Sequence, residues 1–109
     1  MLRISSGDQV FLFKENQIVR FESNKETTTV HFADETTSEI YIPVETIKKQ
    51  IASNNFIQIH QNHLVNVNFI TSIPNQEPGH IEINNNQLLP ISKEQHEIIV
   101  QLISEHLNT

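Results

Sequence analysis

Apolar and polar residues alternate along the first third of the chain, as they do in strands with one buried face. Val10 to Phe13 and Ile18 to Phe21 carry this pattern on either side of the short polar segment 14–16, which predicts a hairpin. β-branched and aromatic residues predict two more strands, separated by a polar turn. The four predicted strands cover residues 10–13, 18–21, 27–32 and 39–42, with a polar loop at 23–26.

After Pro43 the apolar period changes from two to about 3.6 residues, which is the period of a helix. Val44, Ile47 and Ile51 then lie on one face of a short helix predicted near 43–52. A second helix is predicted near 92–106, where isoleucines and leucines form one apolar stripe. Ser92 and Gln95 have the spacing of a capping box at its start.

The segment from Phe56 to Asn75 contains no Asp, Glu, Lys or Arg. Its apolar residues predict two strands around His60 to His63, followed by strand character from Val67 to Ile70. A turn over 74–79, a strand over 80–83, a hairpin tip at 84–86 and a strand over 87–89 complete the pattern. The sequence predicts a mainly β, α+β fold in a single domain over residues 1–109.

Composition removes several classes of function. The chain has no Cys, which excludes disulfides and thiolate metal sites, and only two isolated Gly, which excludes glycine-rich nucleotide loops. No apolar run is long enough for a membrane span or a signal peptide, so we expect a cytoplasmic protein without a membrane partner. No catalytic arrangement is evident, and we expect neither an enzyme nor a cofactor.

Of the six histidines, His60 and His63 have a spacing that raises the question of a metal site. In a strand, side chains alternate between faces, so the spacing of His60 and His63 predicts that they point to opposite faces, one buried and one exposed. A small metal or ligand site at this pair remains a minor alternative. The other four histidines lie in polar contexts and are predicted at the surface: His31, His80, His96 and His106.

The tip between His60 and His63 contains Gln61 and Asn62. A carboxamide can pair bidentately with the N6 and N7 edge of adenine, so these side chains could distinguish bases without carrying charge. Amides are also ordinary turn residues, and the pattern alone leaves both interpretations open.

The string FIQIHQNHLVNVNFITSI, from Phe56 to Ile73, resembles the signature of the LytTR DNA-binding domain. Three neighbouring blocks agree with this resemblance in order and spacing, over about residues 8–107. They are IVRFES from Ile18 to Ser23, VETIKKQI from Val44 to Ile51, and PISK from Pro90 to Lys93.

The resemblance implies an elongated fold of about ten strands in small antiparallel sheets. It also implies sequence-specific binding of double-stranded promoter DNA at repeated sites, through loops in successive major grooves. The partners implied are a second copy on DNA and a receiver domain of a bacterial two-component response regulator. The residues carried over to the DNA-binding site are Asn24, Lys25, His60, Gln61, Asn62 and Lys93.

The chain departs from the family pattern in charge. Gln61 and Glu94 stand where members often have Arg, and the formal net charge is −6. Lys25, Lys93 and Lys14 are the cations expected to neutralise phosphates, which predicts a shallow salt dependence of about −3 on a log–log plot. The alternative is a LytTR-like interaction or dimerisation module that has lost DNA binding.

Overall fold

The structure is a computed structural model that describes residues 1–73, 79–84 and 87–107. Within these ranges it is mostly β, with ten strands and two α-helices, which confirms the predicted fold class. The strands are β1 (Leu2–Ser6), β2 (Gln9–Phe13), β3 (Ile18–Asn24), β4 (Thr27–Phe32), β5 (Thr37–Ile40), β6 (Phe56–His60), β7 (His63–Asn66), β8 (Ile70–Ser72), β9 (His80–Ile83) and β10 (Gln87–Pro90). The helices are α1 (Val44–Gln50) and α2 (His96–Leu107), with the 3₁₀ turns η1 (Glu15–Gln17), η2 (Val67–Phe69) and η4 (Lys93–Gln95).

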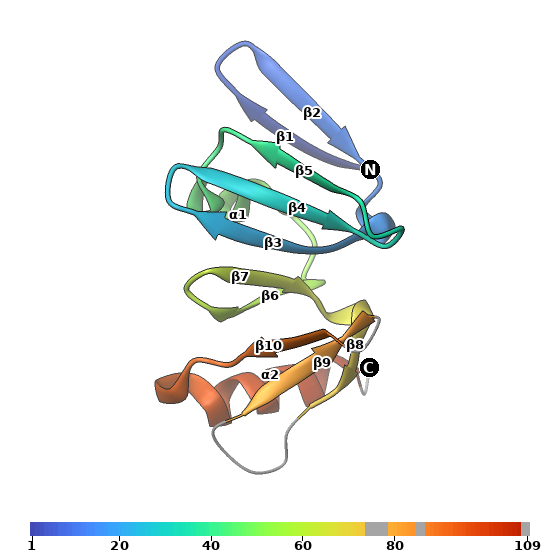
Figure 1. Cartoon of the computed structure of the whole chain (residues 1–109), viewed down its shortest axis with the longest axis vertical. Coiled ribbons are helices and arrows are strands. Elements are labelled where there is room, and N and C mark those ends of the chain that lie inside the picture. Colours follow the sequence, from blue (N-terminus) through green and yellow to red (C-terminus); the bar gives the residue numbers. More distant parts are fainter. Residues whose placement is uncertain (74–78, 85–86, 108–109) are drawn as a thin grey trace.

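Three antiparallel sheets are stacked along an elongated molecule with principal extents of 45 × 24 × 24 Å (Figure 1). β1 and β2 form a ribbon at one end, and β10, β9 and β8 form a three-stranded sheet at the other. The central sheet has the order β5-β4-β3-β7-β6. Its middle strand, β3, pairs with β4 and with β7, which joins the first half of the chain to the signature segment.

The central sheet separates two apolar cores. Phe21 and Leu64, which are cross-strand partners, point into a core that α1 and the β1–β2 ribbon complete. Val65 points the other way, into a core formed with β9, β10 and α2. Ile47 of α1 and Ile103 of α2 are fully buried in these two cores. Alternation along β3 and β7 therefore places one helix on each side of the sheet.

The predicted hairpin of 10–13 with 18–21 is wrong. β2 pairs with β1, a strand that the sequence pattern missed, and the predicted turn at 14–16 is part of the segment containing η1, which leads into β3. Phe11 and Phe13 pack on the first core while Val10 and Leu12 are exposed. Alternation identified a strand correctly but carries no information about its partner.

Both helices lie where they were predicted, with different starts. α1 begins after Pro43, and the second helix begins as η4 before α2. Ser92 makes no side-chain capping bond to the helix, because its hydroxyl donates to Glu94 at 3.2 Å instead, so the capping-box prediction is wrong for Ser92. No helix in the described ranges is long and apolar enough to cross a bilayer.

Other strand predictions were close. β4 has the predicted bounds, whereas the strand predicted over 39–42 lies at Thr37–Ile40. The strand character expected from Val67 to Ile70 is wrong over η2, where Asn66 caps a 3₁₀ turn. The predicted turn over 74–79, except Gly79, and Asn85 and Asn86 of the predicted hairpin tip lie outside the described residues.

Candidate nucleic-acid interface

Three segments that are distant in sequence meet along one long edge of the molecule (Figure 1, left). They are the β3–β4 turn at Lys25 and Glu26, the β6–β7 turn at Gln61 and Asn62, and the start of η4 at Lys93. The Ser23 amide donates to the Asn62 carbonyl at 2.8 Å, and the Ser92 amide donates to the Ile59 carbonyl at 2.8 Å. These two backbone bonds fix the β6–β7 turn between its neighbours.

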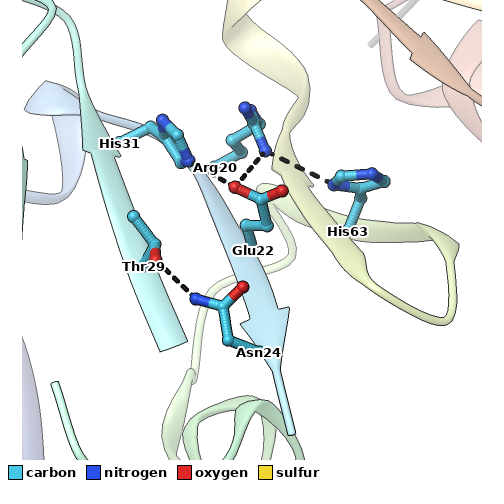
Figure 2. A network of polar contacts seen from close by, with 6 residues as sticks. All are labelled: Arg20, Glu22, Asn24, Thr29, His31 and His63. Carbon is cyan, nitrogen blue, oxygen red and sulfur yellow. Dashed lines mark hydrogen bonds and ion pairs between the residues drawn. The ribbon is translucent and has the colours of Figure 1, made fainter. Parts of the chain in front are cut away.

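The β3–β4 turn presents one cation and one amide. Lys25 is exposed and has a φ of 70°, in the left-handed region that favours glycine. Asn24, predicted in a loop, is the last residue of β3, and its Nδ2 donates to Thr29 Oγ1 at 2.6 Å. This bond orients the Asn24 side chain along β4 (Figure 2). Lys25 therefore stands at the tip of the turn, with Asn24 beside it.

In the β6–β7 turn, His60 and His63 are cross-strand partners, and their ring centroids lie 5.6 Å apart. The prediction that they point to opposite faces is wrong, because a two-residue turn places residues i and i+3 directly opposite each other on one face. His60 Nδ1 accepts from the Asn62 amide at 3.2 Å. His60 thus supports the turn that exposes Gln61 and Asn62.

A further cation, which the sequence did not indicate, lies beside this turn. Lys48, exposed on α1, donates from Nζ to Gln58 Oε1 at 2.6 Å, and Gln58 Nε2 donates to the Gln61 carbonyl at 3.5 Å. Ten residues separate Lys48 from Gln58, so no local spacing could predict this contact. Lys14 precedes η1 at the other end of β3, about 20 Å away for a seven-residue strand, so it lies apart from this turn.

Lys93 and Glu94 are both exposed at the start of η4. Between this turn and the β6–β7 turn lies a cleft of about 340 Å³. It is lined by Gln58, His60, Gln61, Ser92 and Glu94. The cleft is polar, and its lining, as far as the described residues go, includes a carboxylate but no Lys or Arg.

A polar network lies on the central sheet beneath the edge (Figure 2). Arg20, only 4% exposed, lies 3.5 Å from Glu22, and the Nε2 of His31 lies 2.9 Å from the same carboxylate oxygen. Arg20 Nη1 also lies 3.4 Å from His63 Nδ1. The network joins β3, β4 and β7, the strands that carry the β3–β4 and β6–β7 turns.

The contacts and burial within this network shift the pKa values of its members. Burial and the Arg20 charge lower the pKa of His63 to about 4, which keeps its ring neutral and lets Nδ1 accept from Arg20. Burial alone would raise the pKa of Glu22, but the His31 hydrogen bond and the Arg20 charge outweigh it and lower that pKa. Burial lowers the pKa of Arg20, and Glu22 opposes that shift in part.

The predictions of surface positions for the other histidines are only partly correct. His80 is exposed as predicted, whereas His96 is buried with both ring nitrogens lacking a hydrogen-bond partner, and His31 is half-buried against Glu22. In the described part of the chain, no three His, Cys, Asp or Glu side chains are grouped to hold a metal ion.

The chemical groups on this edge are exposed amides and three separated cations. Gln61 and Asn62 supply paired donors and acceptors, and Lys25, Lys48 and Lys93 supply positive charge on three sides of them. Amides suit base edges in a major groove, and ammonium groups suit phosphates.

Comparisons with known proteins concern the family and the fold of the chain. A family model described as the LytTr DNA-binding domain matches residues 8–104. Among solved structures, the chain is similar to the LytTr DNA-binding domain of a Bacillus cereus protein described as a methyl-accepting/DNA response regulator. That similarity has a TM-score of 0.71 and 17% sequence identity over 94% of each chain, so it concerns the fold. No curated protein sequence matches the chain.

Proposed function

The chain belongs to the LytTR DNA-binding domain family, and from this premise we propose that it is the sequence-reading domain of a bacterial transcription regulator. In this proposal the three turns of the long edge enter successive major grooves of promoter DNA. The binding elements are two turns between strands and the 3₁₀ turn η4, so the duplex must follow the edge of the sheets.

One observation carries the proposal. The three segments that the family resemblance selects, at residues 24–25, 60–62 and 93, lie on the same edge and are tied together by the Ser23–Asn62 and Ser92–Ile59 backbone bonds. Turns held in this way need no ordering on binding, which lowers the entropic cost of association.

Each residue has a distinct role in the proposal. Gln61 and Asn62 contact base edges, because carboxamides discriminate adenine through paired hydrogen bonds. Lys25 and Lys93 contact phosphates and fix the position of the edge on the duplex. Asn24 lies within reach of the first groove, and His60 positions the Gln61–Asn62 turn through its bond to the Asn62 amide.

The wider context is part of the same proposal. The domain acts in the cytoplasm, attached to or working with a receiver domain, and two copies occupy repeated half-sites. This assignment is supported by the described similarity to a response-regulator domain and by the family's DNA-binding description. We assign the chain no catalytic activity and no cofactor.

Selection from a random DNA pool tests the proposal. The purified domain should enrich a repeated motif with half-site centres about 10 bp, or a multiple of this, apart. Failure to enrich any motif at low salt, where phosphate attraction is strongest, would contradict it.

Two substitutions separate the roles. Gln61→Ala should cost about 1–3 kcal/mol for the selected site and little for scrambled DNA, because it removes a base contact. Lys93→Ala should weaken binding to both DNAs alike and make the salt slope shallower by about one. Titration of both variants against both DNAs at several salt concentrations is the measurement, and equal losses for Gln61→Ala on the two DNAs would exclude base recognition.

A second function, a protein-interaction module, is favoured by one observation. Glu26 adjoins Lys25 and Glu94 adjoins Lys93, so each exposed turn cation has an exposed acid beside it. Such acids weaken attraction to phosphates and suit a basic protein partner. Capture of a basic protein together with no binding to any DNA would support this function over the first.

A further inference from the structure

Glu94 lies in the proposed DNA interface, where a carboxylate repels phosphates. It lines the cleft between the β6–β7 turn and η4 together with Gln61, and its Oε2 accepts from the Ser92 hydroxyl at 3.2 Å. Ser92 is itself anchored by its backbone bond to Ile59. The carboxylate therefore lines a polar cleft and has one hydrogen bond to an anchored neighbour.

The hydrogen bonds within the cleft determine which donor and acceptor atoms remain available to a ligand. The Gln58 amide is engaged on both sides, by Lys48 and by the Gln61 carbonyl, and His60 Nδ1 is engaged by the Asn62 amide. The Ser92 hydroxyl uses its proton on Glu94. An ionised carboxylate has about four lone-pair sites, so Glu94 keeps unused acceptor capacity after this bond. The Gln61 amide and the second ring nitrogen of His60 keep donors, but Glu94 is the one charged group among the described lining residues, so the cleft favours a donor at its carboxylate.

In a major groove, donors are the exocyclic amino groups of cytosine and adenine, and a carboxylate pairs with cytosine N4. Guanine and thymine present carbonyl oxygens in the groove, which the carboxylate would repel.

We propose that this cleft is a cytosine subsite and that Glu94 is a specificity-determining residue of the DNA interface. This inference rests on the proposed function. Gln61, on the opposite wall of the cleft, contacts the neighbouring base, so that the two residues together define a short sequence.

The test compares the motifs that the wild-type domain and three variants select from random DNA. Wild type should require cytosine at one position within the motif, with a preference of about 10- to 100-fold over thymine and guanine. Glu94→Ala should lose that preference at this position alone. Glu94→Gln should keep cytosine in part and admit adenine, because an amide can pair with adenine.

Glu97→Ala is the matched control, because Glu97 is an exposed acid three residues further on and does not line the cleft. Removing either acid should raise the affinity for all DNA by relieving repulsion. An affinity increase seen in both Glu94→Ala and Glu97→Ala therefore does not report on sequence specificity. An unchanged motif for Glu94→Ala would overturn the cytosine subsite while leaving the proposed function intact. Enrichment of no motif by the wild-type domain would overturn both.

Discussion

At the scale of single residues, Asn66 connects three segments from a buried position. Its Nδ2 donates to the Ile18 carbonyl at 2.9 Å and lies 3.4 Å from the Glu15 carbonyl, and its Oδ1 accepts from the Asn68 amide at 3.0 Å. Its side chain is 1% exposed. Asn66 thus ties the signature string to the start of β3, because one short carboxamide supplies both a donor and an acceptor.

Asn66→Ala should lower the free energy of unfolding by about 2–3 kcal/mol, because it leaves buried carbonyl and amide groups unpaired. Urea denaturation followed by circular dichroism measures the loss. Asn68→Ala, at an exposed neighbouring position, is the control and should cost less than about 0.5 kcal/mol. A stability of Asn66→Ala equal to that of the control would show that these bonds contribute nothing.

His63 predicts how stability depends on pH. Its pKa falls from the ordinary value of 6.5 to about 4 in the folded chain, so between these values the unfolded chain binds more protons. Stability is therefore complete above pH 6.5 and declines as the pH falls toward 4. Because the ring is only half-buried, we expect a loss of about 1–2 kcal/mol at pH 5 relative to pH 7.

Unfolding of wild type and His63→Gln at pH 7 and pH 5 is the measurement. Glutamine can still accept from Arg20 but does not titrate, so the variant should lose less stability between these two values. Glu22 adds its own loss only near and below pH 4.5, its ordinary pKa, which separates the two groups. His80→Gln, at an exposed position on β9, should resemble wild type. The same pH dependence in His63→Gln and wild type would rule out His63 as its source.

At the scale of elements, the β3–β4 turn places a charged residue, Lys25, in a backbone conformation that glycine would adopt at lower free energy. Lys25 has a φ of 70°, which costs a non-glycine residue about 1 kcal/mol. Lys25→Gly should therefore stabilise the domain by up to about 1 kcal/mol while weakening DNA binding through loss of one phosphate contact. Thermal unfolding and DNA titration of the same preparation measure both effects.

Glu26→Gly is the matched control in the same turn. Glu26 is not among the residues with positive φ, so glycine there should destabilise the domain by about 0.5–1 kcal/mol. Loss of this acid should also leave DNA binding unchanged or stronger. If Lys25→Gly destabilised the domain as much as Glu26→Gly does, strain at Lys25 would not be the explanation.

The elements also show what the sequence could predict. β4, β6, β7 and both helices follow from local periodicity, because each buries one face and has polar residues at its ends. The pairing of β2 with β1 does not follow, since β2 would bury Phe11 and Phe13 equally well as part of either hairpin. Partner choice depends on the packing of the whole core, which local alternation does not contain.

The candidate site was predictable for a different reason. Its residues came from the resemblance of four sequence blocks to a family, and composition alone left Gln61 and Asn62 as ordinary turn residues. The contribution of Lys48 depends on a tertiary contact, the hydrogen bond from its ammonium on α1 to Gln58 on β6. The pairing of His60 with His63 depends on the turn having two residues, which periodicity could not specify.

At the scale of the whole molecule, the distribution of charge matters more than its sum. The formal charge is −6, yet Lys25, Lys48 and Lys93 stand near one edge of a molecule 45 Å long. Charges further away than about 8–10 Å are largely screened at physiological salt. Most of the acids therefore reduce DNA affinity less than the net charge implies, while Glu26 and Glu94 act at close range.

If Lys48 contacts a phosphate as Lys25 and Lys93 do, the three contacts predict a salt slope of about −3 for log K against log salt concentration. Lys48→Ala should make the slope shallower by about 0.9, because the Gln58 contact brings this ammonium beside the β6–β7 turn. Lys14→Ala removes the same charge about 20 Å away, at the other end of β3, and should leave the slope unchanged. The measurement is titration of one DNA fragment at four or more salt concentrations. If the two variants had equal slopes, DNA would respond to the net charge of the domain and not to the position of Lys48. The phosphate contacts would then have to be assigned to a different surface.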